Sequence, residues 1–81
     1  MTWFAGRGGM KGGIDFERSR PFETMQEAGI YALDQLAPTR PNRGVFVAEG
    51  ENTGGNSWLF GNVHIVTRMN GHVFFQPERW P

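Results

Sequence analysis

The chain contains no cysteine, a single lysine (Lys11) and no long hydrophobic run. The absence of cysteine excludes a disulfide framework and any zinc site built on thiolates, and it fits a reducing cytoplasm. No segment approaches the ~20 apolar residues that a membrane-spanning helix needs, and the N-terminus lacks the apolar core of a secretory signal. We therefore expect a cytoplasmic protein without a membrane partner.

An excess of positive charge is also missing, because the formal net charge is +0 at pH 7. A dedicated nucleic-acid-binding protein usually presents a broad basic surface, so this balance disfavours a nucleic-acid partner. A net charge near zero also favours self-association, which leaves homo-oligomerisation open.

What the chain has instead is aromatic side chains: three Trp, seven Phe and one Tyr among 81 residues. A chain of this length forms one domain and buries only ~60–65% of the surface that its unfolded form exposes. Each aromatic side chain can bury roughly 150–250 Å². The aromatic residues must therefore supply most of the core.

Residues 1–13 carry five glycines and have little propensity for helix or strand. We expect a glycine-rich N-terminal arm, at most with a short edge strand, followed by a single domain over residues 14–81. The run GRGGMKGG has the glycines of a phosphate-binding loop, but it fits neither the P-loop spacing nor the dinucleotide-binding fingerprint. Flexibility is the simpler explanation of this composition.

The sequence predicts one helix, preceded by a strand. Residues 14–18 alternate between apolar and charged side chains, as a half-buried strand does. Thr24 and Glu27 have the spacing of a capping box at a helix start. Apolar residues then recur on one helical face, and Pro38 ends the helix. A helix of about three turns cannot be stable alone, so it must lie on a sheet.

Three further strands are predicted in the second half. Residues 44–48 form the first, and the turn-forming residues 49–56 follow as a loop. Strand character resumes at 57–60, and Gly61 and Asn62 mark a bulge or turn. Residues 63–76 form a hairpin, because Asn70 and Gly71 tolerate the positive φ angles of a type I′ turn. The result is an α+β fold of β-α-β-β-β order, an antiparallel sheet with one helix packed on one face.

The residues that could support catalysis or metal binding are sparse. The two histidines, His64 and His72, fall far apart along the predicted hairpin, and no cysteine can complete a metal site. No hydroxyl residue lies in a recognisable nucleophile motif. The carboxylate pairs at 15/17 and 49/51 are as simply explained by a solvated surface. We therefore predict that the protein is not an enzyme, and that it holds no metal or cofactor.

Acidic and aromatic residues supply the candidate binding surface. The acidic residues concentrate around the predicted helix and in the 49–56 loop, and together they could bind a basic protein partner. One helix covers only one face of a sheet, so some of Trp58, Phe60, Phe75 and Trp80 should be exposed unless the arm or a second subunit covers them. The candidate partner-binding residues are Asp15, Glu17, Glu27, Asp34, Glu49, Glu51, Trp58 and Phe60.

A small, cysteine-free α+β chain with acidic residues beside aromatic ones resembles the anti-CRISPR proteins of phages and mobile elements, in particular inhibitors of type I-C systems. The resemblance is one of type, since that group shares no diagnostic motif. It implies an inhibitor that works in the cytoplasm of a bacterial host and binds a Cas effector subunit with a basic surface. Two alternatives stay open, a phage structural or assembly subunit and a small nucleic-acid-binding regulator. The regulator would use Arg7, Lys11, Arg18, Arg20, Arg40 and Arg43.

Overall fold

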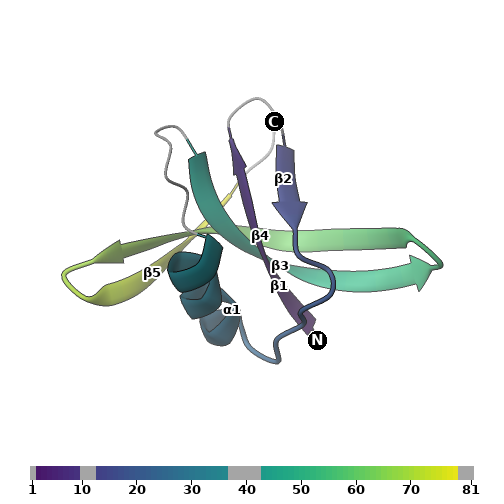
Figure 1. Ribbon diagram of the computed structural model, residues 1–81, viewed down its shortest axis with the longest axis horizontal. Helices are drawn as coiled ribbons and strands as arrows, with labels where there is room; N and C mark the ends of the chain where they lie inside the picture. The colour runs from purple at the N-terminus through teal and green to yellow at the C-terminus, as the bar shows by residue number, and fades with distance from the viewer. Residues whose placement is uncertain (1, 10–12, 37–42, 79–81) are drawn as a thin grey trace.

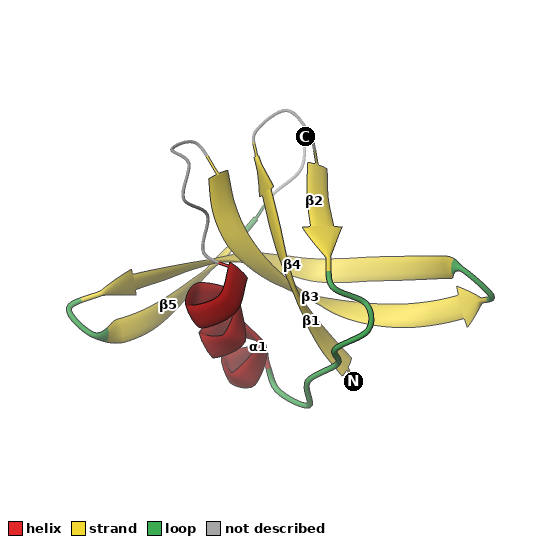
Figure 2. Ribbon diagram, in the orientation of Figure 1, coloured by secondary structure: helices red, strands yellow, loops and turns green. Residues whose placement is uncertain are grey.

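The computed structural model describes residues 2–9, 13–36 and 43–78, which form one antiparallel sheet and one helix (Figures 1 and 2). The fold is α+β with a single domain, as the sequence predicts. The elements are β1 (Thr2–Gly9), β2 (Gly13–Phe16), α1 (Met25–Tyr31) with its π-helical continuation η1 (Ala32–Leu36), β3 (Arg43–Gly54), β4 (Ser57–Met69) and β5 (His72–Pro77).

The N-terminal segment is a strand inside the sheet rather than an arm. The strand order is β2-β1-β3-β4-β5, and β1 is paired with β3 from Thr2 opposite Gly50 onward. The glycines of β1 permit a close approach of β2. A Cβ atom at Gly6 would lie 2.7 Å from the carbonyl oxygen of Asp15, and one at Gly8 would lie 2.5 Å from that of Gly13. The glycine-rich composition thus reflects tight strand packing over residues 2–9, while residues 10–12 lie outside the described residues.

The helix begins where the capping box predicts. Thr24 has an extended backbone, and its hydroxyl accepts a hydrogen bond from the Glu27 amide at 3.2 Å. The hydroxyl also donates to the Glu27 carboxylate at 3.0 Å. The predicted end of the helix at Pro38 lies outside the described residues.

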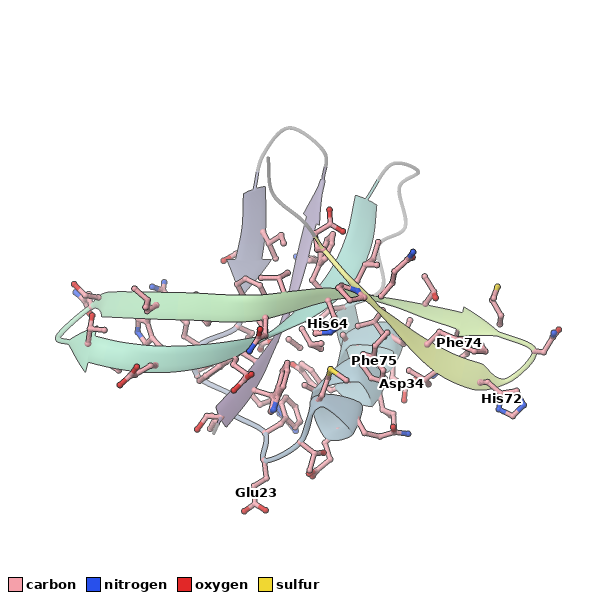
Figure 3. The ribbon with its side chains drawn as sticks, turned by 180° about the vertical axis from the view of Figure 1, so that it is seen from behind. Glu23, Asp34, His64, His72, Phe74 and Phe75 are labelled. Atoms are coloured by element: carbon pink, nitrogen blue, oxygen red, sulfur yellow. The ribbon has the colours of Figure 1, made fainter. Side chains whose placement is uncertain are left out.

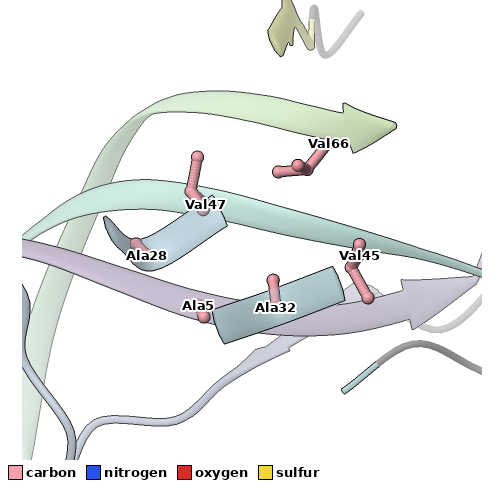
Figure 4. Packing of buried hydrophobic residues seen from close by; sticks show 6 residues of the cluster. All are labelled: Ala5, Ala28, Ala32, Val45, Val47 and Val66. Atoms are coloured by element: carbon pink, nitrogen blue, oxygen red, sulfur yellow. The ribbon is translucent and has the colours of Figure 1, made fainter. Parts of the chain in front are cut away.

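The core beneath the helix is built from small side chains. Ala28 and Ala32 of the helix pack against Ala5, Val45, Val47 and Val66 of the sheet, all at most 3% exposed (Figure 4). Alanine at the contact lets the helix approach the strands closely. Larger, half-buried side chains such as Trp3 and Phe75 complete the cluster at its margin.

The strand β3 is longer than the sequence predicts, because most of residues 49–56 are strand and not loop. The turn itself is Gly55 and Asn56, and Gly54 and Gly55 have positive φ angles of 138° and 56°. The side-chain oxygen of Asn52 accepts from the Gly54 amide at 2.8 Å, which stabilises the turn. The predicted irregularity at Asn62 is confirmed: β4 carries an extra residue there, and Asn62 has a φ of 49°.

The second hairpin forms as the sequence predicts. Met69 lies opposite His72, and His64 lies opposite Pro77. The φ angles of Asn70 and Gly71 are 52° and 79°, the left-handed values of a type I′ turn. The two hairpins extend from opposite ends of β4, β3–β4 to one side of the molecule and β4–β5 to the other (Figure 1).

Candidate protein-binding surface

The β3–β4 hairpin continues beyond the helix, and we call its residues 49–61 the distal hairpin. One face of it is occupied by an aromatic cluster. The ring of Phe4, which is 2% exposed, lies 5.2 Å from Trp58 and 5.8 Å from Phe60, edge to face. Phe16 of β2 stacks on Phe60 at 4.6 Å. The cluster joins the hairpin to β1 and β2, so the distal hairpin is held in place on this face.

The opposite face of the distal hairpin carries the candidate binding residues. Residues two apart on a strand share a face, so Glu49 and Glu51 lie on the same side as Val47 of the core. Leu59 is paired with Glu51 and has 65% of its surface exposed. These side chains border an open pocket lined by Thr2, Glu49, Gly50, Glu51, Leu59, Gly61 and Asn62. The pocket lining thus combines two carboxylates with an exposed leucine, and none of its residues in the described part of the chain is basic.

The bulge in β4 positions Glu49. The side-chain amide of Asn62 donates a short hydrogen bond to the Glu49 carboxylate. The carbonyl oxygen of Asn62 in turn accepts from Nδ1 of His64 at 2.7 Å, and the His64 ring meets the edge of Trp3 at 6.2 Å between centroids. Because a carbonyl can only accept, the proton of a neutral His64 lies on Nδ1. Glu49 is therefore oriented by a network that sequence reasoning did not anticipate.

The acids of the helix lie elsewhere and are engaged locally. Glu27 belongs to the helix cap, and Asp34 accepts from Arg68 at 2.9 Å in an exposed ion pair. Arg68 is nine residues from Leu59 along β4, a separation of up to about 30 Å in an extended strand. Asp34 therefore lies apart from the distal hairpin and does not join Glu51 in a single acidic surface.

Asp15 and Glu17 are surrounded by mixed charge. Both lie in a pocket that also includes Arg7 and Arg18. The Tyr31 hydroxyl donates to the Glu17 carboxylate at 2.7 Å. This hydrogen bond, with burial and the negative charge of Glu17, raises the pKa of Tyr31 above its usual value, although Arg20 opposes the shift. Of the candidate acids, Glu49 and Glu51 alone share a pocket without a basic residue among those the structure describes.

The described arginines considered for nucleic-acid binding lie around the acids Asp15 and Glu17 and not on a purely basic surface. Arg7 and Arg18 lie beside the acids named above, and the Arg20 guanidinium lies 4.8 Å from the centroid of the Tyr31 ring. Lys11 and Arg40 lie outside the described residues, as does the side chain of Arg43.

The exposed hydrophobic residues differ from those that the sequence suggested. Trp58, Phe60 and Phe75 are half-buried, and Trp80 lies outside the described residues. Trp58 and Phe60 are covered by Phe4 of β1, a segment that the glycine-rich sequence predicts to be an arm. The large exposed hydrophobic residues are Ile30, Leu59, Met69 and Phe74. Phe74 could have been found from the strict alternation of the β5 hairpin, which places it on the face opposite Phe75.

Among residues 2–9, 13–36 and 43–78, no group of three or more His, Asp or Glu side chains has an arrangement suited to a metal ion. The one described helix is too short to cross a membrane.

No protein-family model matches this chain, and neither the curated proteins nor the solved structures include a significant match. The surface of the distal hairpin is therefore interpreted from its own chemistry.

Proposed function

We propose that this protein is a non-enzymatic, protein-binding inhibitor that uses the distal hairpin to block a CRISPR–Cas effector complex. One observation carries the binding part of the proposal. Glu49, Glu51 and the exposed Leu59 share one face of the distal hairpin, and the aromatic cluster packs on its opposite face. Protein-binding surfaces commonly combine an exposed apolar side chain with neighbouring charged groups on a rigid part of the fold.

The charge of this face favours a basic partner. Carboxylates such as Glu49 and Glu51, which share their pocket with no basic residue of the described chain, attract lysine and arginine. Electrostatic complementarity raises the association rate and the specificity of a complex. A Cas effector binds nucleic acid and must therefore present basic surfaces. The resemblance in size, composition and fold type to small anti-CRISPR proteins supports the choice of this target, with a type I-C effector as the first to test.

A binding experiment with charge variants tests the proposal. The purified type I-C effector complex is immobilised, and binding of the wild type is compared with Glu51→Lys and Leu59→Ser. We expect both substitutions to weaken binding at least tenfold, because one reverses a charge at the contact and the other removes the apolar anchor.

The matched control is Glu23→Lys, which makes the same charge change at an exposed residue between β2 and α1, where the side chain points away from the molecule (Figure 3). It should bind as the wild type does. Equal loss of binding in Glu23→Lys and Glu51→Lys would show that binding depends on the net charge of the protein and not on the distal hairpin. Absence of binding by the wild type would reject the proposed target.

A further inference from the structure

Hydrophobic exposure is concentrated at one edge of the sheet. Of the four large exposed hydrophobic residues in the described part of the chain, three lie in β5 or next to it: Phe74 of β5 is 46% exposed, Met69 58% and Ile30 41%. Ile30 lies on the helix side, in a pocket that it shares with Val73. Phe74 belongs to the opposite face, beside His72 of the same strand (Figure 3). Apolar surface is thus exposed on both faces of this edge.

The backbone of β5 is also available for pairing. The Glu78 amide donates to Val63 at 2.8 Å, and hydrogen-bonded and non-bonded positions alternate along an antiparallel pair. His72, Phe74 and Gln76 therefore direct their backbone groups toward β4. Val73 and Phe75 direct theirs away from the sheet, where β5 has no neighbouring strand among the described residues.

Edge strands of monomeric proteins are usually short or carry a charge that blocks further pairing. β2, the other edge, has both features: it spans four residues and includes Asp15. β5 spans six residues, His72–Pro77, and contains no Asp, Glu, Lys or Arg. Only Pro77, which lacks an amide hydrogen, limits pairing at its end.

We propose that β5 is a dimerisation edge, on which a second copy of this chain pairs antiparallel through its own β5 to form a continuous sheet. The strand is self-complementary in one register. Val73 pairs with Phe75 of the second copy and Phe75 with its Val73, so the outward backbone groups bond to one another. Phe74 then lies opposite Phe74 of the second copy at a non-hydrogen-bonded position, where aromatic side chains make close cross-strand contact.

The charges of the edge agree with a second copy as the occupant. In this register His72 faces Gln76 of the second copy, so no like-charged pair is brought together. The net charge of +0 adds no repulsion between whole molecules. The proposal is independent of the proposed function, because the distal hairpin and β5 lie at opposite ends of β4 (Figure 1).

Cysteine crosslinking tests the register directly, since the chain has no cysteine of its own. Phe74→Cys places two thiols opposite each other across the two-fold axis. The Cα atoms at such a position are about 4.5 Å apart, within the roughly 4.4–6.8 Å range of disulfides. Gln76→Cys is the register control, because it puts the thiols four residues apart, and Leu59→Cys controls for random collision.

We expect the wild type to sediment at twice the 9.1 kDa mass of the chain at tens of micromolar. Phe74→Cys should oxidise to a covalent dimer at least tenfold faster than either control, with an unchanged circular dichroism spectrum. A wild type that stays at 9.1 kDa up to several hundred micromolar would overturn the proposal. So would a dimer in which Gln76→Cys or Leu59→Cys crosslinks as fast as Phe74→Cys.

Discussion

Gly50 is the position where one methyl group tests the aromatic cluster. It lies in β3 between the rings of Phe4 and Phe60, and a Cβ atom there would approach each ring to 2.7 Å. Carbon atoms in contact prefer about 3.5–4.0 Å, so Gly50→Ala forces both rings to retreat by about 1 Å. Phe4 is 2% exposed and has little room to move. Overpacking of this kind costs about 1–3 kcal/mol.

Part of that cost is offset, because alanine restricts the unfolded chain and gains about 0.4–1 kcal/mol where the backbone suits it. We expect Gly50→Ala to lower the free energy of unfolding by about 1–2 kcal/mol. For a domain of this size the melting temperature should fall by about 4–16 °C. The assay is thermal and urea unfolding followed by circular dichroism and by tryptophan fluorescence, to which Trp58 of the cluster contributes with the two other tryptophans.

Gly61→Ala is the matched control on the same hairpin. A Cβ atom at Gly61 meets nothing within 4 Å, and its φ is not in the left-handed region. This substitution should leave stability unchanged or raise it by up to about 1 kcal/mol. If Gly50→Ala proves as stable as Gly61→Ala, the rings of the cluster do not pack around Gly50. That result would refute the claim that the aromatic cluster holds the distal hairpin in place.

Three further predictions concern the helix and its contacts. Gly29→Ala raises helix propensity, but its Cβ would lie 2.5 Å from the ring of Phe75, so we expect a net loss of about 1 kcal/mol in urea unfolding. Thr24→Ala removes the cap and should cost about 1 kcal/mol in the same assay. The raised pKa of Tyr31 means that the folded state holds this proton more tightly, so its stabilising contribution is present below pH ~10 and is lost as pH rises through the folded pKa. Absorbance titration of this single tyrosine should show the shift, and Glu17→Gln should reduce it; an unchanged titration would contradict the hydrogen bond.

The sequence predicts turns, bulges and helix starts well where a particular residue type is needed for the local backbone conformation. The hairpin at Asn70 and Gly71 and the cap at Thr24 form as expected, because a left-handed turn and a free amide each demand particular residues. The bulge at Asn62 follows the same logic. These features depend on the conformation of a few consecutive residues.

The errors arise where a residue acts through distant partners. The glycines of β1 resemble a flexible arm in composition, yet Gly6 and Gly8 are required by strands that pack against them from elsewhere in the chain. The position of one candidate acid, Asp34, was missed for the same reason. Asp34 is neutralised by Arg68, a pairing across 34 residues that no local pattern encodes. The pairs Asp15/Glu17 and Glu49/Glu51 each lie on one surface, because residues two apart on a strand share a face.

The two proposed surfaces are compatible in one assembly. A dimer formed through β5 would leave the distal hairpin of each copy exposed at the far end of β4. Such a dimer would present two binding hairpins to its target, and simultaneous engagement of two sites raises the overall affinity without any new contact.

Inhibition of target-DNA binding by a purified type I-C effector complex is the most direct test of the central claim. We expect the wild type and Glu23→Lys to abolish DNA binding in a concentration-dependent manner, while Glu51→Lys requires at least ten times more protein for the same effect. DNA binding that persists at saturating wild-type protein, or that Glu51→Lys abolishes as well as the wild type does, would contradict it.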